Sequence, residues 1–244
     1  MSDWPDSWGR IALATTDSTN AAARRLAMEG QPLPFWVSAA VQTAARARRG
    51  RAWIGGEGNL ACSAALRPGQ SPAGAALRSF AASVALAEAL ERLGVSPARI
   101  ALKWPNDVLL DGGKLAGILL ESTPLKGALL LVIGVGVNLA AAPDRNDVEP
   151  GALVPAALPT VTASELLPPL ARRFDHWNTR LTVEGFAPLR SAWLARATRL
   201  GTRIEARLPG QTLSGIFETV DGQGALVLDT AMGRQHLAAA DVFF

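Results

Sequence analysis

The stretch KWPNDVLLDGGKLAGILLE, residues 103–121, constrains the fold of this chain more than any other segment. Two apolar runs flank the tetrapeptide Asp-Gly-Gly-Lys, and this pattern predicts a β-hairpin because tight hairpin turns favour such residues. A strand would deliver Lys103, a Trp-Pro-Asn-Asp corner would follow, and the hairpin would deliver Lys114. Two cations and the amide of Asn106 would then surround one cleft, where compact ammonium groups can reach phosphate or carboxylate oxygens.

The use of lysine supports a functional role for this hairpin. Lysine and arginine together number 24, but only Lys103, Lys114 and Lys126 are lysines. The preference for arginine is a bias of the whole chain, so two lysines in one hairpin depart from that background. A surface hairpin with incidental lysines is the alternative that spacing alone leaves open.

The rest of the pattern predicts an α/β domain followed by a small β unit. Apolar residues at three- and four-residue steps indicate helices, and Asp17 or Ser18 would cap the first of them. Pro168 and Pro169 leave the start of the last helix open. A Pro- and Ala-rich connecting loop covers 141–160. The predicted helices cover 19–30, 76–94 and 164–197, and the predicted strands cover 35–42, 60–66, 100–104, 107–110, 115–121 and 128–137.

From Gly201 onward, short alternating runs are separated by turns at Pro-Gly-Gln and Asp-Gly-Gln-Gly. This pattern is typical of a small all-β unit of ~45 residues that resembles a β-barrel. Such a unit supplies little core of its own and follows the preceding helix with almost no linker, so we expect it to pack on the larger domain. We predict two domains, residues 1–197 and residues 198–244.

Composition limits the classes of protein to consider. An apolar fraction of 49% with 18% charged residues is that of a globular protein with an ample core. Cys62 is the only cysteine, which excludes an internal disulfide, and His176 and His236 are too few to favour a zinc site. No signal peptide pattern is present, and no segment reaches the ~20 apolar residues that span a bilayer. We expect a soluble, cytoplasmic protein with no metal site and no membrane association.

Two further motifs leave their function open on spacing alone. The segment RARRGR, residues 46–51, fits a solvated loop, a clamp for a small phosphate-bearing molecule or a nucleic-acid contact. The segment GVGVN, residues 134–138, lacks the third glycine of a dinucleotide-binding fingerprint. It is more typical of a buried strand that passes close to another group, with Asn138 at its end. The net charge of +3 permits an anionic substrate without requiring nucleic acid.

Residues 103–121 closely resemble the signature of the biotin protein ligases. Three more segments agree with that family in the same order, namely DSTNAAARRL at 17–26, QTAARARRGRAWIGGEGNL at 42–60 and VIGVGVNL at 132–139. The resemblance implies an α/β (α+β) catalytic domain similar to the core of class II aminoacyl-tRNA synthetases and biotin–lipoate ligases, with helices flanking a mixed sheet. It also implies a small C-terminal SH3-like β-barrel.

The activity implied by the resemblance is the two-step attachment of biotin to protein. Biotin and ATP with Mg²⁺ give biotinyl-5′-adenylate and pyrophosphate, and biotin then passes to one lysine of a biotin carboxyl carrier protein or domain. By resemblance, the catalytic residues are Lys114 and Arg48; the biotin-binding residues are Ser18, Thr19, Asn20, Gln42, Arg46, Lys114 and Gly117; and the residues for ATP or the adenylate are Arg48, Arg51, Trp53, Lys103, Asn106, Lys114 and Asn138.

The arginine-rich loop departs from the family pattern. The family usually has Gly-Arg-Gly-Arg-Arg-Gly-Arg, whereas this chain has Ala45 and Ala47 at the first two glycine positions. Alanine tolerates positive φ poorly, so either these positions are not left-handed or loop closure is costlier here. Gly55 and Gly56 replace the usual Ser-Pro. We predict that residues 44–58 form a mobile loop that orders when biotin or the adenylate binds.

Some family members carry an N-terminal winged helix and repress transcription. This chain has 17 residues before Ser18, so we expect the monofunctional type, without sequence-specific DNA binding. A homodimer is left open. Three alternative functions remain at this stage: a lipoate- or octanoate-transferring relative, a nucleic-acid-binding module that uses the arginine loop, and a catalytically inactive scaffold.

Overall fold

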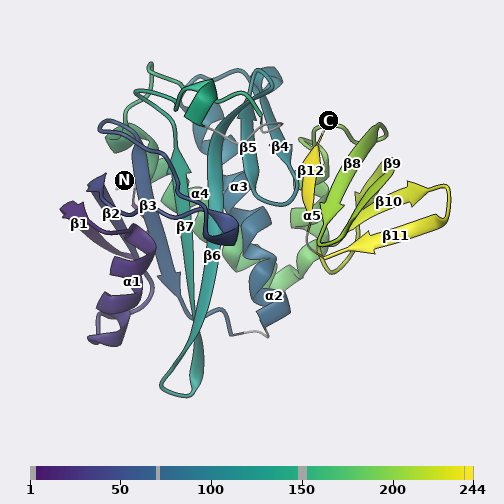
Figure 1. Ribbon diagram of the computed structural model, residues 1–244. Coiled ribbons are helices and arrows are strands. Elements are labelled where there is room, and N and C mark those ends of the chain that lie inside the picture. Colours follow the sequence, from purple (N-terminus) through teal and green to yellow (C-terminus); the bar gives the residue numbers. More distant parts are fainter. Residues whose placement is uncertain (1–3, 70–71, 148–152, 239, 244) are drawn as a thin grey trace.

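The computed structural model describes residues 4–69, 72–147, 153–238 and 240–243. Its larger part is a seven-stranded mixed sheet in the order β1-β2-β3-β7-β6-β5-β4 (Figure 1). β1 and β2 pair in parallel, and the other neighbours are antiparallel. The strands are β1 (Gly9–Thr16), β2 (Phe35–Gln42), β3 (Leu60–Leu66), β4 (Ile100–Lys103), β5 (Asp107–Leu110), β6 (Gly113–Leu125) and β7 (Ala128–Val137).

The predicted strands agree with this sheet in most places. β2, β3, β5 and β7 have the predicted bounds, and β6 extends beyond the predicted 115–121 at both ends. β1 has no predicted counterpart. It lies at the edge of the sheet, and its sequence GRIALATT has few large apolar residues, so its alternation is weak. The prediction of a mixed sheet flanked by helices is confirmed.

Helices cover both faces of this sheet. Phe35 and Val37 of β2 pack in one cluster with Ala23 of the first helix, whereas Trp36 between them packs in the larger core. Because successive side chains of a strand point to opposite faces, α1 covers one face while α3 and α4 cover the other (Figure 1). Within the described ranges, every helix is too short or too polar to cross a membrane. The helices are α1 (Thr19–Met28), α2 (Pro72–Ala76), α3 (Arg78–Arg92), α4 (Ala163–Glu184) and α5 (Phe186–Leu194).

The last predicted helix is divided into α4 and α5. α4 begins with a capping box, in which the Thr162 hydroxyl accepts from the Glu165 backbone N–H and the Glu165 carboxylate accepts from the Thr162 backbone N–H. This box fixes the start that the sequence leaves open, and the helix continues through Pro168 and Pro169. Gly185 separates the two helices with a φ of 78°, a left-handed conformation that glycine adopts without strain.

The hairpin predicted from Asp-Gly-Gly-Lys is present between β5 and β6. Asp111 and Gly112 occupy the two turn positions with φ of 50° and 83°, as a type I′ turn requires. Lys126 and Gly127 have φ of 50° and 77° at the tip of the next hairpin, between β6 and β7. The third lysine of the chain therefore lies at a hairpin tip, apart from the two lysines of the signature segment.

The C-terminal part is a five-stranded antiparallel sheet of the SH3-like type, in the order β11-β10-β9-β8-β12. The prediction of a small SH3-like β unit is confirmed. Its edge strands β11 and β12 do not pair with each other within the described residues, and β12, which spans three residues, pairs along β8. The strands are β8 (Arg203–Leu208), β9 (Gln211–Val220), β10 (Leu226–Thr230), β11 (Gly233–Leu237) and β12 (Asp241–Phe243).

This small sheet packs against the larger domain. The indole N–H of Trp104 donates to the carbonyl of Gly224 at 3.0 Å, and Nη2 of Arg190 on α5 donates to Oγ1 of Thr219 at 2.9 Å. These bonds place the C-terminal sheet beside the Trp-Pro corner of the signature segment. The domain boundary at residue 197 stays a prediction.

Candidate functional site

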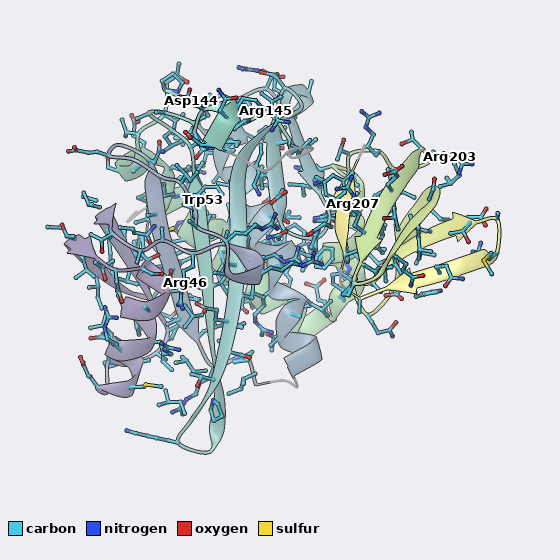
Figure 2. All side chains as sticks on the ribbon, in the orientation of Figure 1. Arg46, Trp53, Asp144, Arg145, Arg203 and Arg207 are labelled. Carbon is cyan, nitrogen blue, oxygen red and sulfur yellow. The ribbon has the colours of Figure 1, made fainter. Side chains whose placement is uncertain are left out.

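A cavity of about 460 Å³ lies on the face of the sheet that α1 partly covers. Leu130 and Val132 of β7 pack beneath α1, and Gly134 and Gly136 follow on the same face because strand side chains alternate. Figure 2 shows Arg46 and Trp53, from the loop between β2 and β3, over the middle of the sheet. Every predicted site residue lines this cavity: Ser18, Thr19, Asn20, Gln42, Arg46, Arg48, Arg51, Trp53, Lys103, Asn106, Lys114, Gly117 and Asn138.

Glycines make the floor of the cavity, so other side chains can lie directly against the backbone. Gly117 of β6 pairs with Gly136 of β7. A Cβ on Gly136 would lie 2.7 Å from the indole nitrogen of Trp53, and a Cβ on Gly134 would lie 2.3 Å from Oδ1 of Asn20. Both distances are too short for real contacts. The glycines of the GVGVN segment therefore allow the side chains of Trp53 and Asn20 to lie against the backbone of β7, and such close approach is what these glycines predict.

The N-terminus of α1 supplies hydrogen-bonding groups to one end of the cavity. Ser18 is the N-cap residue, and its side chain makes no capping hydrogen bond within the part of the chain that the structure describes. The backbone N–H and the hydroxyl of Thr19 both donate to Oε1 of Gln42, at 2.8 and 3.2 Å. Oγ of Ser63 on β3 lies 2.8 Å from Oγ1 of Thr19 and donates to Oδ1 of Asn20 at 2.7 Å. The sequence prediction misses Ser63 because a single serine in an apolar strand carries no signal.

Two lysines and one carboxylate form the cationic centre. Nζ of Lys114 lies 2.8 Å from Oδ1 of Asp107, and Nζ of Lys103 lies 3.9 Å from Oδ2 of the same residue. The sheet register brings them together, because Lys103 pairs with Asp107 and Lys114 pairs with Leu109, two residues along β5 from Asp107. Burial lowers the pKa of Lys103, and the charge of Asp107 opposes this effect. Asp107 is a site residue that the prediction omits, although it follows Asn106 in the signature.

The backbone conformation of the arginine loop shows whether Ala45 and Ala47 must adopt a positive φ. Neither Ala45 nor Ala47 has a positive φ, and Ala47 is extended with φ of −114°. The left-handed residues are Arg49 and Gly50, with φ of 58° and 74°, at the end of a single 3₁₀ turn. The glycines that this chain lacks are therefore not needed for the backbone conformation observed here. Ordering of this loop by ligands stays a prediction.

The first two arginines of the loop have partners on the large sheet. Nη2 of Arg46 lies 3.2 Å from Oε1 of Glu121 on β6, and Nη1 of Arg48 donates to Oδ1 of Asn106 at 3.2 Å. Asn106 donates in turn to the carbonyl of Ile118 at 2.7 Å, which fixes its amide. Arg48 is half-buried, and burial lowers its pKa. The sequence prediction misses Glu121, the last residue of the signature.

The last two arginines of the loop reach the C-terminal sheet. Arg49 forms an ion pair with Asp241 of β12, and Nη2 of Arg51 lies 3.9 Å from Oδ1 of Asp241. Arg207 of β8 stacks on Phe243, with its guanidinium carbon 3.9 Å from the ring centroid. Asp241, Arg207 and Phe243 all line the cavity. The prediction misses them because tertiary packing alone brings them to the site, and no motif in the C-terminal segment indicates it.

Trp53 and Asn138 supply an aromatic face and an amide to the cavity. The ring centroid of Trp53 lies 5.8 Å from Nζ of Lys114. Asn138, directly after β7, is 2% exposed and donates weakly from Nδ2 to the carbonyl of Lys114 at 3.4 Å. Its Oδ1 has no donor among the described residues. A buried amide oxygen without a donor is costly, so this atom is suited to a ligand N–H.

Comparison with known proteins decides which family this site represents. Residues 12–138 match the Biotin/lipoate A/B protein ligase family, and residues 200–244 match the Biotin protein ligase C terminal domain. A biotin–[acetyl-CoA-carboxylase] ligase of Paracoccus denitrificans is 49% identical over 95% of this chain and 99% of its own length. This chain belongs to the biotin protein ligase family. The enzyme of the same name from Mycobacterium tuberculosis is 35% identical to this ligase over 96% of this chain and 89% of its own length.

Solved structures agree on the fold of the ligase. The biotin protein ligase of Aquifex aeolicus, in complex with biotin and ATP, has a TM-score of 0.78 at 23% identity and covers 96% of this chain and 97% of its own. The ligase of Leishmania major, in complex with biotinyl-5-AMP, has a TM-score of 0.65 at 22% identity, over 96% of this chain and 100% of its own. At this identity, the likeness establishes the fold of both the catalytic core and the C-terminal sheet.

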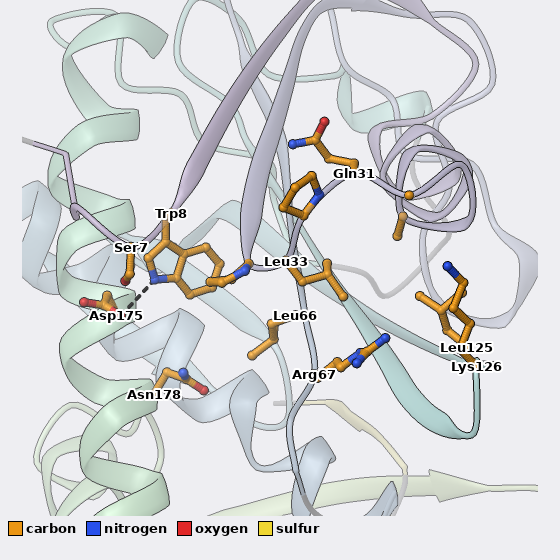
Figure 3. Close-up of a pocket in the computed structure, with 14 residues that line it drawn as sticks. Ser7, Trp8, Gln31, Leu33, Leu66, Arg67, Leu125, Lys126, Asp175 and Asn178 are labelled. Atoms are coloured by element: carbon orange, nitrogen blue, oxygen red, sulfur yellow. Dashed lines mark hydrogen bonds between the residues drawn. The ribbon is translucent and has the colours of Figure 1, made fainter.

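A second cavity of the ligase, about 640 Å³, has entirely different lining residues (Figure 3). The indole N–H of Trp8 donates there to Oδ1 of Asp175 at 2.8 Å, and Arg67 and Lys126 contribute positive charge. Its described lining includes none of the predicted site residues, so we assign it no part in the reaction.

Two residues weighed at the sequence level lie outside the site of the ligase. Cys62 is fully buried, and burial raises the pKa of its thiol, as expected for an unreactive core cysteine. His176 is exposed on α4. The described residues contain no group of three or more His, Cys, Asp or Glu side chains that could hold a metal ion.

Proposed function

We propose that this ligase converts biotin and ATP to biotinyl-5′-adenylate and pyrophosphate. It then transfers biotin to one lysine of a biotin carboxyl carrier protein or domain, with AMP as the leaving group. The observation that carries the proposal is the convergence of Lys114, Lys103 and Arg48 in a single cavity. The same cavity is also lined by the hydrogen-bonding residues at the start of α1, by the aromatic ring of Trp53 and by Asn138, whose Oδ1 has no donor among the described residues. The residues at the start of α1 would suit a polar heterocycle, the lysines and Arg48 would suit an anionic linkage between two groups, and Trp53 with Asn138 would suit a purine.

The cationic centre suits the first step chemically. A biotin carboxylate oxygen must attack the α-phosphorus of ATP, with pyrophosphate as the leaving group, and both reactants are anions. Fixed cations lower this barrier because they stabilise the negative charge that develops on the bridging and leaving oxygens. We assign Lys114 to the carboxylate and the α-phosphate, because its ammonium group is held at the centre of the cavity by Asp107. Lys103, Arg48 and Arg51 would bind the remaining phosphate oxygens.

The two ends of the cavity suit the two ends of the intermediate. Ser18, Thr19, Asn20 and Gln42 offer donors and acceptors for the ureido ring of biotin, and Gly117 allows the ligand to approach the sheet. In the part of the cavity that Asn138 and Trp53 line, Oδ1 of Asn138 would accept a hydrogen bond from the adenine amino group, and Trp53 would pack against the base. This ligand N–H would satisfy the buried oxygen, which supports the assignment of adenine there.

Magnesium would enter with ATP and be held chiefly by its phosphates. The carboxylate oxygens of Asp107 lie 2.8 and 3.9 Å from the two lysine ammonium groups. This carboxylate therefore pairs with lysines of the protein itself, and we do not assign it as a ligand of the ion. When bound, the ion supplies further positive charge to the phosphates.

The arginine loop gives little support to nucleic-acid binding as the second candidate function. Three of its arginines already meet carboxylates: Arg46 meets Glu121, and Arg49 and Arg51 meet Asp241. A phosphate backbone would have to displace these partners, and a spread basic face is what such binding requires. We propose that the ligase binds no specific DNA sequence.

The test is to incubate the protein with ATP labelled at the α-phosphate and with biotin, lipoate or octanoate in parallel. We expect pyrophosphate release and a labelled adenylate with biotin. A carrier domain with its target lysine should then become biotinylated, and the same domain with that lysine replaced by arginine should not. Pyrophosphate release without biotin dependence, or a preference for lipoate, would contradict the proposal.

A further inference from the structure

Glu121 connects the arginine loop with the hydrogen-bonding end of the cavity. It lies on β6, and its carboxylate oxygens are 3.2 and 3.3 Å from Nη2 of Arg46. Nδ2 of Asn20 donates to the same carboxylate at 2.8 Å. The ion pair is half-exposed and therefore weak by itself, but Asn20 is 4% exposed, so the second contact is withdrawn from water. No step of the proposed reaction uses Glu121.

The carboxylate fixes the orientation of the Asn20 amide, because an ionised carboxylate can only accept hydrogen bonds. Nδ2 of Asn20 donates to Glu121 and, at 3.4 Å, to the carbonyl of Leu119. Oδ1 of Asn20 is left to accept, and the donor is the hydroxyl of Ser63 at 2.7 Å. Ser63 is fully buried and has a single proton, so this bond leaves its oxygen as an acceptor.

The same logic extends to Thr19. Its hydroxyl lies 2.8 Å from Oγ of Ser63 and 3.2 Å from Oε1 of Gln42. Because the Ser63 proton goes to Asn20, the single proton of Thr19 goes to one of these two oxygens. Thr19 must therefore donate its proton within the protein, which leaves its lone pairs for a ligand. A continuous chain of hydrogen bonds thus runs from the exposed guanidinium of Arg46 to the end of α1 that lines the cavity.

We propose that Glu121 is a positioning residue for biotin, an inference that rests on the proposed function. It holds Arg46 over the pocket, and through Asn20 and Ser63 it orients the Thr19 hydroxyl to accept from a ureido N–H. One carboxylate therefore contributes both to the position of the loop and to the polarity of the pocket. Ser63 is the second positioning residue in this chain of contacts.

Substitutions at Glu121 separate its charge from its shape. Glu121→Ala removes both contacts, and the KM for biotin should rise about tenfold, as the loss of a charge-assisted hydrogen bond predicts. Glu121→Gln keeps an acceptor for Asn20 but weakens the contact with Arg46, so its KM for biotin should rise about threefold. In both variants kcat and the KM for ATP should stay close to the wild-type values. Biotin-dependent pyrophosphate release measures all of these quantities.

Three further variants test the contacts to the pocket and the contacts to the loop separately. Ser63→Ala should raise the KM for biotin without changing hydrogen exchange in the loop, because Ser63 acts on the pocket wall alone. Arg46→Ala combined with Glu121→Ala should cost less than the sum of the single changes, since the two residues share one interaction. Glu57→Gln is the matched control, because Glu57 is an exposed carboxylate of the same loop. It should leave every value unchanged.

Hydrogen exchange of residues 45–52 in the substrate-free protein tests the link to the loop without any reaction. Glu121→Ala should accelerate this exchange, and Glu57→Gln should not. Unchanged loop exchange together with an unchanged KM for biotin in Glu121→Ala would overturn the inference, as would a fall in kcat with KM intact. A wild-type protein that releases no pyrophosphate with biotin would instead refute the proposed function. If Glu121→Ala fails to fold, Glu121→Gln decides the question.

Discussion

The lysines and the arginines that border the cavity are positioned in different ways. Lys103 on β4 and Lys114 on β6 lie on either side of β5 and share its Asp107, which lies between them in the sequence. The arginines stand on a loop and depend on distant partners, which are carboxylates for Arg46, Arg49 and Arg51 and the amide of Asn106 for Arg48. Arg46 pairs with Glu121, 75 residues away in the sequence, and Arg49 pairs with Asp241, 192 residues away. One set of cations is fixed by the ladder of a hairpin, and the other set is fixed by tertiary contacts.

This difference shows which part of the site is preformed. The hydrogen bonds of β4, β5 and β6 hold the lysines wherever the sheet is folded. Arg49 and Arg51 need the C-terminal sheet in place, and Arg46 and Arg48 need the loop to lie on the large sheet. Loop segments with few contacts open most readily. We therefore expect changes on the sheet to reduce the rate of the chemical step, and changes on the loop to alter substrate affinity.

The largest effect should come from Lys114→Ala. The charge that this lysine stabilises develops during attack on the α-phosphate, so adenylate formation should slow by about 100- to 1,000-fold while biotin affinity changes little. Lys114→Arg should rescue the rate only in part, because a planar guanidinium does not fit the space of an ammonium group. Single-turnover pyrophosphate release and biotin titration measure the two quantities.

The matched control is Lys126→Asn, which removes the third lysine at a hairpin tip where φ is 50°. Asparagine tolerates this conformation, so the change removes charge without strain. Its rate should equal that of the wild type. A similar loss in the two variants would show that net charge, rather than placement on the sheet, is what matters.

Asp107→Asn should have the next largest effect, up to about 100-fold in rate, because the two ammonium groups lose the anion that positions them. It should also change the pH dependence. Burial already lowers the pKa of Lys103, and the charge of Asp107 raises it. Without that charge the pKa falls further, so the alkaline loss of activity should begin at a lower pH than in the wild type. A pH–rate profile that keeps its alkaline limb in place would contradict this account.

Features that depend on local sequence could be predicted, and features that depend on tertiary contacts could not. The hairpin could be predicted because Asp111 and Gly112 form a turn whose chemistry is local. β5 has the expected bounds, and β6 extends beyond them at both ends. Every predicted site residue lines the cavity because the motifs that carry them are short and continuous. β1 could not be predicted, since an edge strand with small residues has a weak pattern.

The residues that sequence reasoning missed at the site are those whose function depends on a distant partner. Ser63 acquires its role from α1, and Asp241 acquires its role from the arginine loop. Neither belongs to a recognisable motif, so their contacts appear only when the chain is folded. Alternation likewise predicts the strands of the C-terminal sheet but not whether its two edges meet.

Gly136→Ala tests the place where the loop meets the sheet. The new Cβ would lie 2.7 Å from the indole nitrogen of Trp53, so the ring must shift away from its position on the floor. Overpacking of this kind costs about 1–3 kcal/mol, and we expect a rise of about tenfold in the KM for ATP. Gly56→Ala is the control, because a Cβ there meets nothing within 4 Å. Equal KM values for the two variants would show that Trp53 does not bind the nucleotide.

The smallest effect should come from Asp241→Asn, which frees the loop from the C-terminal sheet. Arg49 and Arg51 would lose their shared carboxylate, and a half-exposed ion pair contributes at most about 1 kcal/mol, so the KM for ATP should rise no more than about fivefold. Salt screens such pairs, so the difference from wild type should shrink as ionic strength increases. Asp229→Asn, an exposed change on β10 of the same sheet, should leave the KM for ATP unaltered. If Asp241→Asn slowed single-turnover adenylate formation as much as Asp107→Asn, the C-terminal sheet would be acting on the chemical step, and the contrast between preformed lysines and conditional arginines would fail.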